Sequence, residues 1–173
     1  MPRVKERILA LDVSGSCTGW AYAVDGKPIA WGKYIQKESE VKGKKLAEFA
    51  SWLCTLLETK KPDIILVERP YRGRNSNVLV NLSKFIAIVE LCAYVTLKLD
   101  IPGEWFRDPR SIKKALKVAK GQDYHDNKKL MVQKINQLYN LKLKYNAKKS
   151  KAYNDDDTAD SLAILVAWWA KDA

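Results

Sequence analysis

Two short apolar runs that each end on an acidic residue place the strongest constraint on how this chain can fold. Residues 7–12 read Arg-Ile-Leu-Ala-Leu-Asp, and residues 64–68 read Ile-Ile-Leu-Val-Glu. Runs this short and this apolar are typical of strands that are covered on both faces of a sheet. If the two strands are parallel neighbours, Asp12 and Glu68 emerge at the same edge of the sheet, where α/β folds usually place their sites.

The rest of the pattern predicts three antiparallel strands, then a helix, a strand, a helix, a strand and further helices. Two more strands are expected at residues 19–24 and roughly 28–35, joined by an Asp25-Gly26 hairpin. A short strand is expected at residues 104–106. Helices are expected at about 46–57, 77–99, 109–121 and 127–139, and from the acids near residue 155 onward. This order indicates an α/β layer architecture with a mixed sheet.

The chain is strongly basic. It has 31 Lys and Arg residues against 20 Asp and Glu residues, which gives a formal net charge of +11. Such an excess favours a polyanionic partner, most often nucleic acid, although charge alone is a weak signal because solvated lysine faces are common. The 173 residues, 47% of them hydrophobic, are enough for one domain with a sizeable core and exclude wholesale disorder.

Cysteine use and the first residues indicate a reducing compartment. The three cysteines, Cys17, Cys54 and Cys92, are widely spaced among apolar residues, so they read as small core residues and not as a disulfide framework or a zinc site. The first seven residues show no signal-peptide pattern, and no apolar run reaches the length of a membrane span. We therefore expect a cytoplasmic protein with no membrane partner.

Four carboxylates, those of Asp155, Asp156, Asp157 and Asp160, crowd into six residues before a last apolar helix. Acids this close repel one another, and on a phosphate-facing surface they would repel the phosphates too, unless they hold divalent metal. Asp157 and Asp160 share one helix face, whereas Asp155 and Asp156 are expected to cap the helix and face solvent. Oxygen ligands suit Mg²⁺ or Mn²⁺, and the lack of a Cys/His cluster argues against zinc.

Three segments resemble motifs of the RuvC-type Holliday-junction resolvases, especially the phage branch. Residues 12–21, Asp-Val-Ser-Gly-Ser-Cys-Thr-Gly-Trp-Ala, look like the first motif of that family. Residues 66–71, Leu-Val-Glu-Arg-Pro-Tyr, are similar to the second motif, a hydrophobic strand that closes on Glu. Residues 157–164 resemble the terminal motif, Asp-x-x-Asp followed by a small and apolar helix. The resemblance covers nearly the whole chain, in the family's order and spacing.

This resemblance implies a single ribonuclease-H-like nuclease domain over residues 1–173, from a bacterial or phage-infected cell and with no organic cofactor. Its fold would be a mixed five-stranded sheet, three antiparallel strands then two parallel ones, flanked by helices. The resemblance implies that the protein is a homodimer and that its activity is to make two symmetric nicks across a four-way junction. Asp12, Glu68, Asp157 and Asp160 would bind two Mg²⁺ ions, for which Mn²⁺ would substitute. One ion would activate the attacking water, and the other would stabilise the leaving 3′ oxygen.

The resemblance also implies which side chains contact DNA. Lys113 and Lys128 align with two family lysines and are predicted to be both catalytic and DNA-binding, the second across an insertion at residues 122–125. Tyr71 lies where the family carries an aromatic residue that can stack at the junction centre, and the alternative is that it packs under its own loop. Phosphate contacts are further expected from two basic loops: Arg69, Arg72 and Arg74 after the second motif, and Lys148 and Lys149 in the lysine-rich run 142–151. Either loop could instead be merely solvated.

The segment 77–99 is apolar nearly all round, which indicates either a central core helix or half of a subunit interface, and we expect it to form the homodimer. Two other functions fit the same residues. A different ribonuclease-H-like nuclease, acting on other branched DNA, flaps or RNA/DNA hybrids, would keep the metal site. In a non-catalytic nucleic-acid-binding module, the acids would serve only as turn and cap residues.

Overall fold

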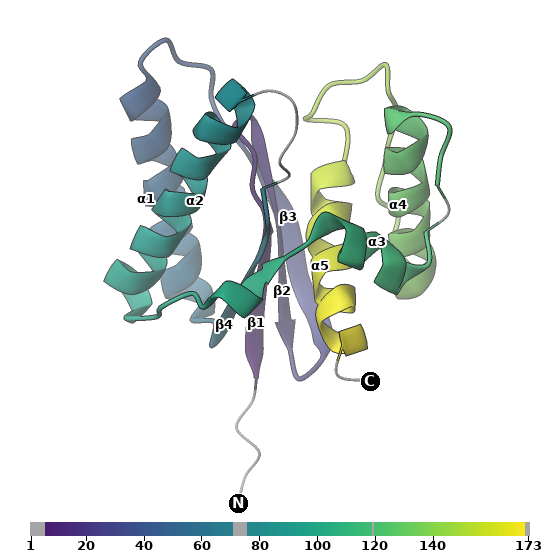
Figure 1. The fold of residues 1–173 in the computed structure, drawn as a ribbon, viewed down its shortest axis with the longest axis horizontal. Coiled ribbons are helices and arrows are strands. Elements are labelled where there is room, and N and C mark those ends of the chain that lie inside the picture. Colours follow the sequence, from purple (N-terminus) through teal and green to yellow (C-terminus); the bar gives the residue numbers. More distant parts are fainter. Residues whose placement is uncertain (1–5, 71–75, 119, 172–173) are drawn as a thin grey trace, which may run out of the picture.

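A five-stranded mixed sheet lies between two layers of helices (Figure 1). The computed structural model describes residues 6–70, 76–118 and 120–171. The strand order is β3-β2-β1-β4-β5, in which β1, β2 and β3 are antiparallel and β1, β4 and β5 are parallel. The strands are β1 (Arg7–Asp12), β2 (Cys17–Val24), β3 (Lys27–Ile35), β4 (Ile64–Glu68) and β5 (Phe106–Arg107). The predicted α/β architecture with three antiparallel and two parallel strands is confirmed.

The helices divide between the two faces of this sheet, and the central strands therefore serve two cores. One layer is formed by α1 (Lys42–Lys60) and α2 (Ser76–Leu97), and the other by α3 (Pro109–Leu116), α4 (Tyr124–Tyr139) and α5 (Asp156–Lys171) (Figure 1). Leu9 and Leu11 of β1 belong to the core beside α1 and α2, whereas Ile8 and Ala10 belong to the core beside α5. Burial on both faces explains why β1 and β4 are apolar throughout.

Several predicted boundaries are wrong, because local hydrogen bonds set the ends of the helices. The basic helix expected to reach residue 121 ends at Leu116, since Lys117 takes a left-handed conformation (φ 52°) and its N–H donates to the carbonyls of Lys113 and Lys114. The helix expected from residue 127 begins at Tyr124, because the side chain of Asp123 caps it. The strand expected at residues 104–106 is a 3₁₀ turn, η1 (Gly103–Trp105), followed by β5.

The predicted start of α3 is confirmed. The Oδ1 atom of Asp108 accepts hydrogen bonds from the backbone N–H groups of Arg110 (2.8 Å) and Ser111 (3.3 Å). Pro109 occupies the first helical position, where its missing N–H costs no helical hydrogen bond.

The cysteines occupy apolar surroundings, as predicted. Cys17 and Cys92 are buried and Cys54 is half-buried, and all three are free thiols. Burial is the main cause that raises the pKa of Cys17 to about 12 and the pKa of Cys92 to about 12. Neutral thiols of this kind are inert packing groups.

Helix α2 is longer and more exposed than a core helix. Its length and composition would be enough to cross a membrane, so the expectation that no segment would reach this length is wrong. Only 22% of its most apolar 18-residue window is buried. Phe85, Val89 and Cys92 pack toward α1. Large apolar side chains on its other side are between 56% and 59% exposed: Val80, Leu91, Tyr94 and Val95. The described residues therefore cover this helix on one side only.

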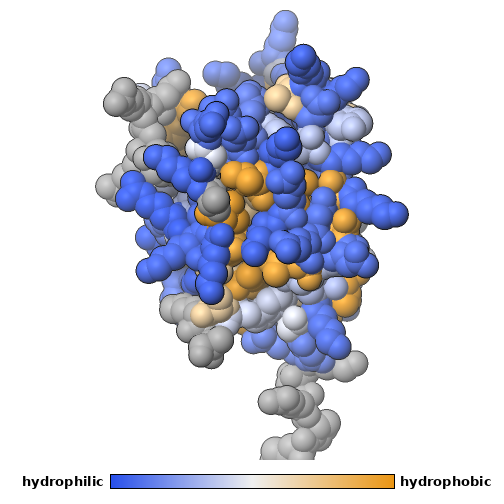
Figure 2. Space-filling model, turned by 90° about the vertical axis from the view of Figure 1, so that its right-hand side faces the viewer, coloured by the Kyte–Doolittle hydropathy of each residue, from blue (hydrophilic) through white to orange (hydrophobic). Residues whose placement is uncertain are grey.

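The core beside α5 also reaches the surface. Figure 2 shows the side of the molecule that lies on the right in Figure 1, where apolar side chains gather in the middle and hydrophilic ones surround them. Partly buried residues such as Leu141, Leu143 and Val166 pack at the margin of this core.

Gly19 sets how closely the acid-bearing helix approaches the sheet. A β-carbon at this position of β2 would overlap the backbone carbonyl oxygen of Asp157 and lie 2.9 Å from the nitrogen of Thr158. The first turn of α5 therefore rests directly on the backbone of β2. Because Asp12 pairs with Gly19 in the β1–β2 register, this contact brings the start of α5 beside the end of β1.

We predict that Gly19→Ala lowers the free energy of unfolding by about 3 kcal/mol, the upper end of the cost of overpacking, because the obstructing atoms are backbone. Gly43→Ala is the matched control, since a β-carbon there meets no atom within 4 Å. Its stability should be unchanged or raised by up to about 1 kcal/mol. Urea unfolding of the two variants checks this, and equal stabilities would contradict the close approach.

Candidate functional site

Acidic side chains from three separate elements meet at one edge of the sheet. Strands β1 and β4 run parallel, with Leu11 opposite Val67, so that Asp12 and Glu68 follow at neighbouring strand ends. Asp160 lies one turn into α5 and lines the same pocket as Glu68. The predicted meeting of β1 and β4 at one edge is thus what the structure shows.

Partial burial of these acids makes the site unfavourable for negative charge. Burial, followed by the charges of Asp160 and Glu68, raises the pKa of Asp12 well above its ordinary value. Burial and the charge of Asp160 raise the pKa of Glu68 to about 7. Burial also raises the pKa of Asp160, although Lys128 opposes this shift. A cluster of this kind needs compensating positive charge.

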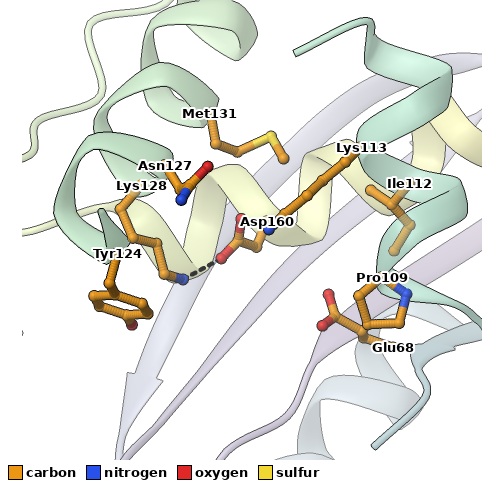
Figure 3. A pocket seen from close by; sticks show the side chains of 9 residues that line it. All are labelled: Glu68, Pro109, Ile112, Lys113, Tyr124, Asn127, Lys128, Met131 and Asp160. Carbon is orange, nitrogen blue, oxygen red and sulfur yellow. Dashed lines mark hydrogen bonds and ion pairs between the residues drawn. The ribbon is translucent and has the colours of Figure 1, made fainter. Parts of the chain in front are cut away.

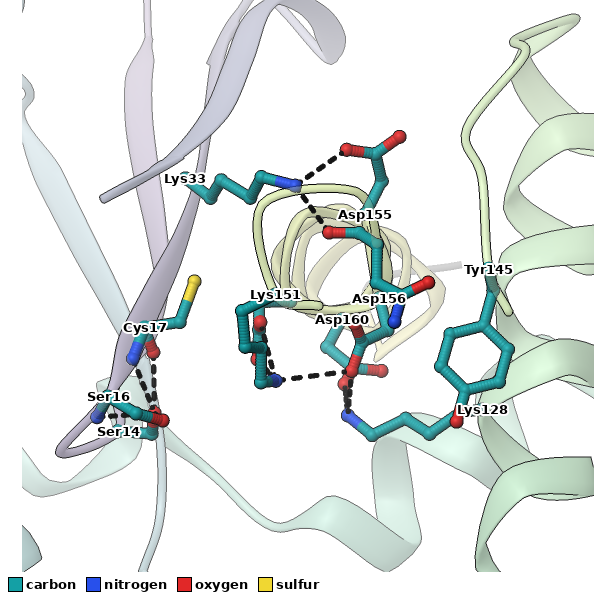
Figure 4. A network of polar contacts seen from close by, with 12 residues as sticks. Ser14, Ser16, Cys17, Lys33, Lys128, Tyr145, Lys151, Asp155, Asp156 and Asp160 are labelled. Atoms are coloured by element: carbon teal, nitrogen blue, oxygen red, sulfur yellow. Dashed lines mark hydrogen bonds and ion pairs between the residues drawn. The ribbon is translucent and has the colours of Figure 1, made fainter. Parts of the chain in front are cut away.

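Two lysines supply that charge (Figure 4). Lys128, from α4, donates a hydrogen bond to Asp160 and lies 3.4 Å from Oδ2 of Asp156. Lys151, from the loop before α5, donates to both carboxylate oxygens of Asp157, at 3.1 and 2.8 Å. Burial disfavours both ammonium groups. The carboxylates outweigh it, chiefly Asp160 for Lys128 and Asp157 for Lys151, so that the pKa of Lys128 is raised and that of Lys151 rises to about 12.

The expectation that Asp156 faces solvent is wrong. Asp156 is 4% exposed, and its Oδ2 lies 3.4 Å from Nζ of Lys128 and 3.5 Å from Nζ of Lys151. The reason is helical geometry, because Asp156 and Asp160 are four residues apart and so share the face toward Lys128. Its other oxygen, Oδ1, is buried and has no hydrogen-bond partner among the described residues.

Asp155 ties the start of α5 to two other parts of the chain. Its Oδ1 lies 3.1 Å from Nζ of Lys33 in β3, and its Oδ2 accepts from the backbone N–H of Lys144. Lys33 also donates to the carbonyl oxygens of Ala152 and Asn154. Asp155 and Lys33 therefore fix the loop that presents Lys151 to the acids.

Lys33, Lys151 and Asp156 are site residues that sequence reasoning missed. Lys151 and Asp156 carried a usable signal, because both lie within six residues of Asp157. Lys33 carried none, since it contacts residues more than a hundred positions away.

A pocket of about 170 Å³ opens beside the acids (Figure 3). Lys113 from α3 and Lys128 from α4 extend toward Asp160, and Glu68 lies across from them (Figure 3). The walls are completed by Pro109, Ile112, Tyr124, Asn127 and Met131. The two lysines that the family resemblance selected are thus both beside the carboxylates, on separate helices.

The other predicted DNA contacts do not line this pocket, and some lie beyond the described ranges. Arg69 is exposed directly after Glu68, and its guanidinium donates to the carbonyl of Gly103 at 3.3 Å. Lys148 and Lys149 are exposed in the loop before α5. Tyr71, Arg72 and Arg74 lie outside the described residues.

The carboxylates of this site are suitable ligands for a hard divalent cation, although three of them are paired with lysines in this structure. Within residues 6–70, 76–118 and 120–171, no group of three or more Asp, Glu, His or Cys side chains is arranged to hold a metal ion as it stands. Asp156 and Asp157 are nevertheless buried, Asp12, Glu68 and Asp160 are half-buried, and Oδ1 of Asp156 has no partner among the described residues. Two ammonium groups lie beside these acids. Carboxylate oxygens at a site that attracts cations are the chemistry that Mg²⁺ and Mn²⁺ prefer.

Neither a protein-family model nor a curated protein matches this sequence, but solved structures match its fold. T. thermophilus RuvC in complex with a Holliday junction substrate aligns with a TM-score of 0.71 at 15% identity, over 96% of this chain and 94% of that one. A Thermus thermophilus RuvC structure gives 0.69 at 15% identity, over 96% and 95%. The yeast mitochondrial Holliday junction resolvase Ydc2 gives 0.61 at 17% identity, over 95% and 78%. The chain therefore has the ribonuclease-H-like fold of RuvC that the motif resemblance predicted.

We predict that Glu68→Gln stabilises the metal-free protein at high pH only. Because the pKa of Glu68 is about 7 in the folded state and 4.5 in the reference state, the unfolded chain releases this proton first as pH rises. The folded protein therefore loses stability between about pH 4.5 and 7, and Gln removes that loss. Urea unfolding with a chelator should show a gain of about 1–3 kcal/mol at pH 8 and little at pH 4.5.

Glu58→Gln, on the exposed side of α1, is the matched control and should change stability little at either pH. A Glu68→Gln gain that is the same at pH 4.5 and pH 8 would contradict the raised pKa.

Proposed function

We propose that this chain is a structure-selective DNA endonuclease that resolves four-way junctions by two symmetric, divalent-metal-dependent phosphodiester nicks. The observation that carries the proposal is the meeting of Asp12, Glu68 and Asp160 beside Lys113 and Lys128, on a fold shared with RuvC over 96% of the chain. RuvC itself was solved with a Holliday junction substrate, and we carry that substrate to this chain on the strength of the site.

In this proposal Asp12, Glu68, Asp157 and Asp160 hold two Mg²⁺ ions, for which Mn²⁺ substitutes. Bound there, such ions lower the pKa of water and neutralise charge that builds on the phosphate. The chain itself orients the ligands, because two strand ends and one helix fix where the carboxylates lie. Lys113 and Lys128 add positive charge on the pocket side of the acids, where a scissile phosphate would lie. Arg69, Lys148 and Lys149 would grip neighbouring phosphates.

Burial of the acids argues against a module in which they serve only as caps. A cap carboxylate accepts backbone N–H groups at a helix end, as Asp108 and Asp123 do here. Asp156, Asp157 and Asp160 instead pair with lysine side chains. Their arrangement is that of a charged site and not of a helix terminus alone.

The homodimer is proposed through α2. Its exposed apolar side chains, Val80, Leu91, Tyr94 and Val95, form a surface that a symmetric partner would cover. Pairing of two such helices would set two active sites on one junction, as two symmetric nicks require.

Incubation with a mobile four-way junction and Mg²⁺, followed by a denaturing gel, tests the proposal directly. Paired nicks at symmetric positions, absent with a chelator, are expected. Faster cleavage of flaps, three-way branches or RNA/DNA hybrids would show that the chain is a different ribonuclease-H-like nuclease. No cleavage of any of these substrates would contradict the proposal.

Asp12→Asn should lower the single-turnover rate of junction nicking by at least about a thousandfold, because charge stabilisation by the bound ions supplies several kcal/mol. Junction binding should survive or tighten, since less negative charge faces the phosphates. Asp25→Asn makes the same change in the β2–β3 hairpin, whose left-handed conformation (φ 50°) suits Asn, and should retain the wild-type rate. Near-full activity of Asp12→Asn would remove this acid from the site.

Leu91→Glu/Val95→Glu should convert the dimer into a monomer at micromolar concentration, because two charges four residues apart would enter the α2 interface. Sedimentation velocity measures this directly. Ala47→Glu/Ser51→Glu adds the same charges with the same spacing to the exposed side of α1 and should leave the dimer intact. A wild-type monomer that still makes coordinated double nicks would rule out the α2 dimer.

A further inference from the structure

A second groove, of about 720 Å³, lies on the other side of α3 from the acidic pocket. Four basic side chains line it, Arg69, Arg107, Lys114 and Lys117, against two acidic ones, Glu104 and Asp108. The carboxylate of Asp108 is already engaged as the cap of α3. The groove therefore carries an excess of positive charge that the site chemistry described above does not use.

Arg107 gives this groove a buried positive charge with no acid to balance it. The residue is 8% exposed, and none of the described carboxylates forms an ion pair with it. Among the described residues its guanidinium makes only long hydrogen bonds, 3.5 Å to the carbonyl oxygens of Glu104 and Ala167, and it stacks 5.5 Å from the ring of Trp168. Its Nε atom has no partner among the described residues. A buried charge of this kind is costly unless an anion approaches it.

The groove adjoins the acidic pocket. Glu68 and Arg107 are opposite one another in the β4–β5 register. Helix α3 presents Lys113 to the pocket and the next residue, Lys114, to the groove.

Along α5, Asp160 lines the pocket and Ala167 lines the groove, and seven helical residues span about 10 Å. That is about three base-pair steps of duplex DNA, whose axis rises 3.4 Å for each phosphate of one strand. A strand whose scissile phosphate lies at the acids would therefore reach the groove within a few nucleotides.

We propose that this groove binds backbone phosphates of the DNA arm a few nucleotides from the scissile phosphate, with Lys114, Lys117 and Arg107 as the new contacts beside Arg69. The inference rests on the proposed nuclease function, because that function is what places DNA at the adjoining pocket. Its role is to hold the arm and not to take part in the reaction.

The double substitution Lys114→Gln/Lys117→Asn removes two positive charges from the groove. Gln keeps the helix propensity at position 114, and Asn tolerates the left-handed conformation at position 117. Lys27→Gln/Lys61→Asn is the matched control, because both lysines are exposed and Lys61 has the same left-handed conformation (φ 45°) as Lys117. The groove variant should bind a four-way junction at least tenfold more weakly than the control. The slope of log affinity against log salt should fall by about two, one for each lost phosphate contact. Its nicking rate at saturating DNA should equal that of wild type.

Neutral methylphosphonates placed one at a time at the second to fifth phosphates from the nick locate the contact. At one or two of these positions the methylphosphonate should lower the affinity of wild type for the junction. At the same positions it should not lower the affinity of the groove variant any further. Equal losses in both proteins, or a wild-type salt slope in the variant, would overturn the groove as a phosphate site. If neither wild type nor the groove variant nicks junctions but their salt slopes differ as expected, the proposed nuclease function is wrong and the groove is still a phosphate-binding site.

Discussion

The structure depends on burying several carboxylates at one edge of a sheet. Burial raises the pKa of Asp12, Glu68 and Asp160, so negative charge at this edge needs cations nearby. Lys128 pairs with Asp160, and Lys151 pairs with the neighbouring Asp157. The divalent ions that we propose would meet the same need for positive charge and, once bound, would attract a phosphodiester.

The rest of the fold serves to bring these charges together. Parallel pairing of β1 and β4 aligns two strand ends. The absence of a side chain at Gly19 lets the first turn of α5 rest on β2. Lys33 and Asp155 then anchor the loop that carries Lys151. Each contact joins segments that are far apart in sequence, so that the site exists only in the folded chain.

Sequence alone could predict the elements whose signals are local and repeated. The apolar runs before Asp12 and Glu68, and the Asp108-Pro109 cap, each determine their own structure. The end of α3 could not be predicted, because it depends on a left-handed Lys117, which is an uncommon conformation for lysine.

The acids of the candidate site were predictable from their positions at strand ends and on one helix face, whereas the pairing of these acids with particular lysines was not. Burial of Asp156 follows from how α5 faces α4, and the contacts of Lys33 cross more than a hundred residues. The basic groove around Arg107 likewise depends on three elements that only the fold assembles. Patterns of two or four residues carry no information about such contacts.

Calorimetric titration of Mn²⁺ into the protein tests the central claim, that the buried acids form a divalent-metal site, most directly. The claim predicts saturable binding of two ions per protomer, or one ion with the second added when a non-cleavable junction is present, and loss of that binding in Asp12→Asn. A wild-type protein that binds no Mn²⁺ with or without junction DNA, or an Asp12→Asn protein that binds it as wild type does, would contradict the account.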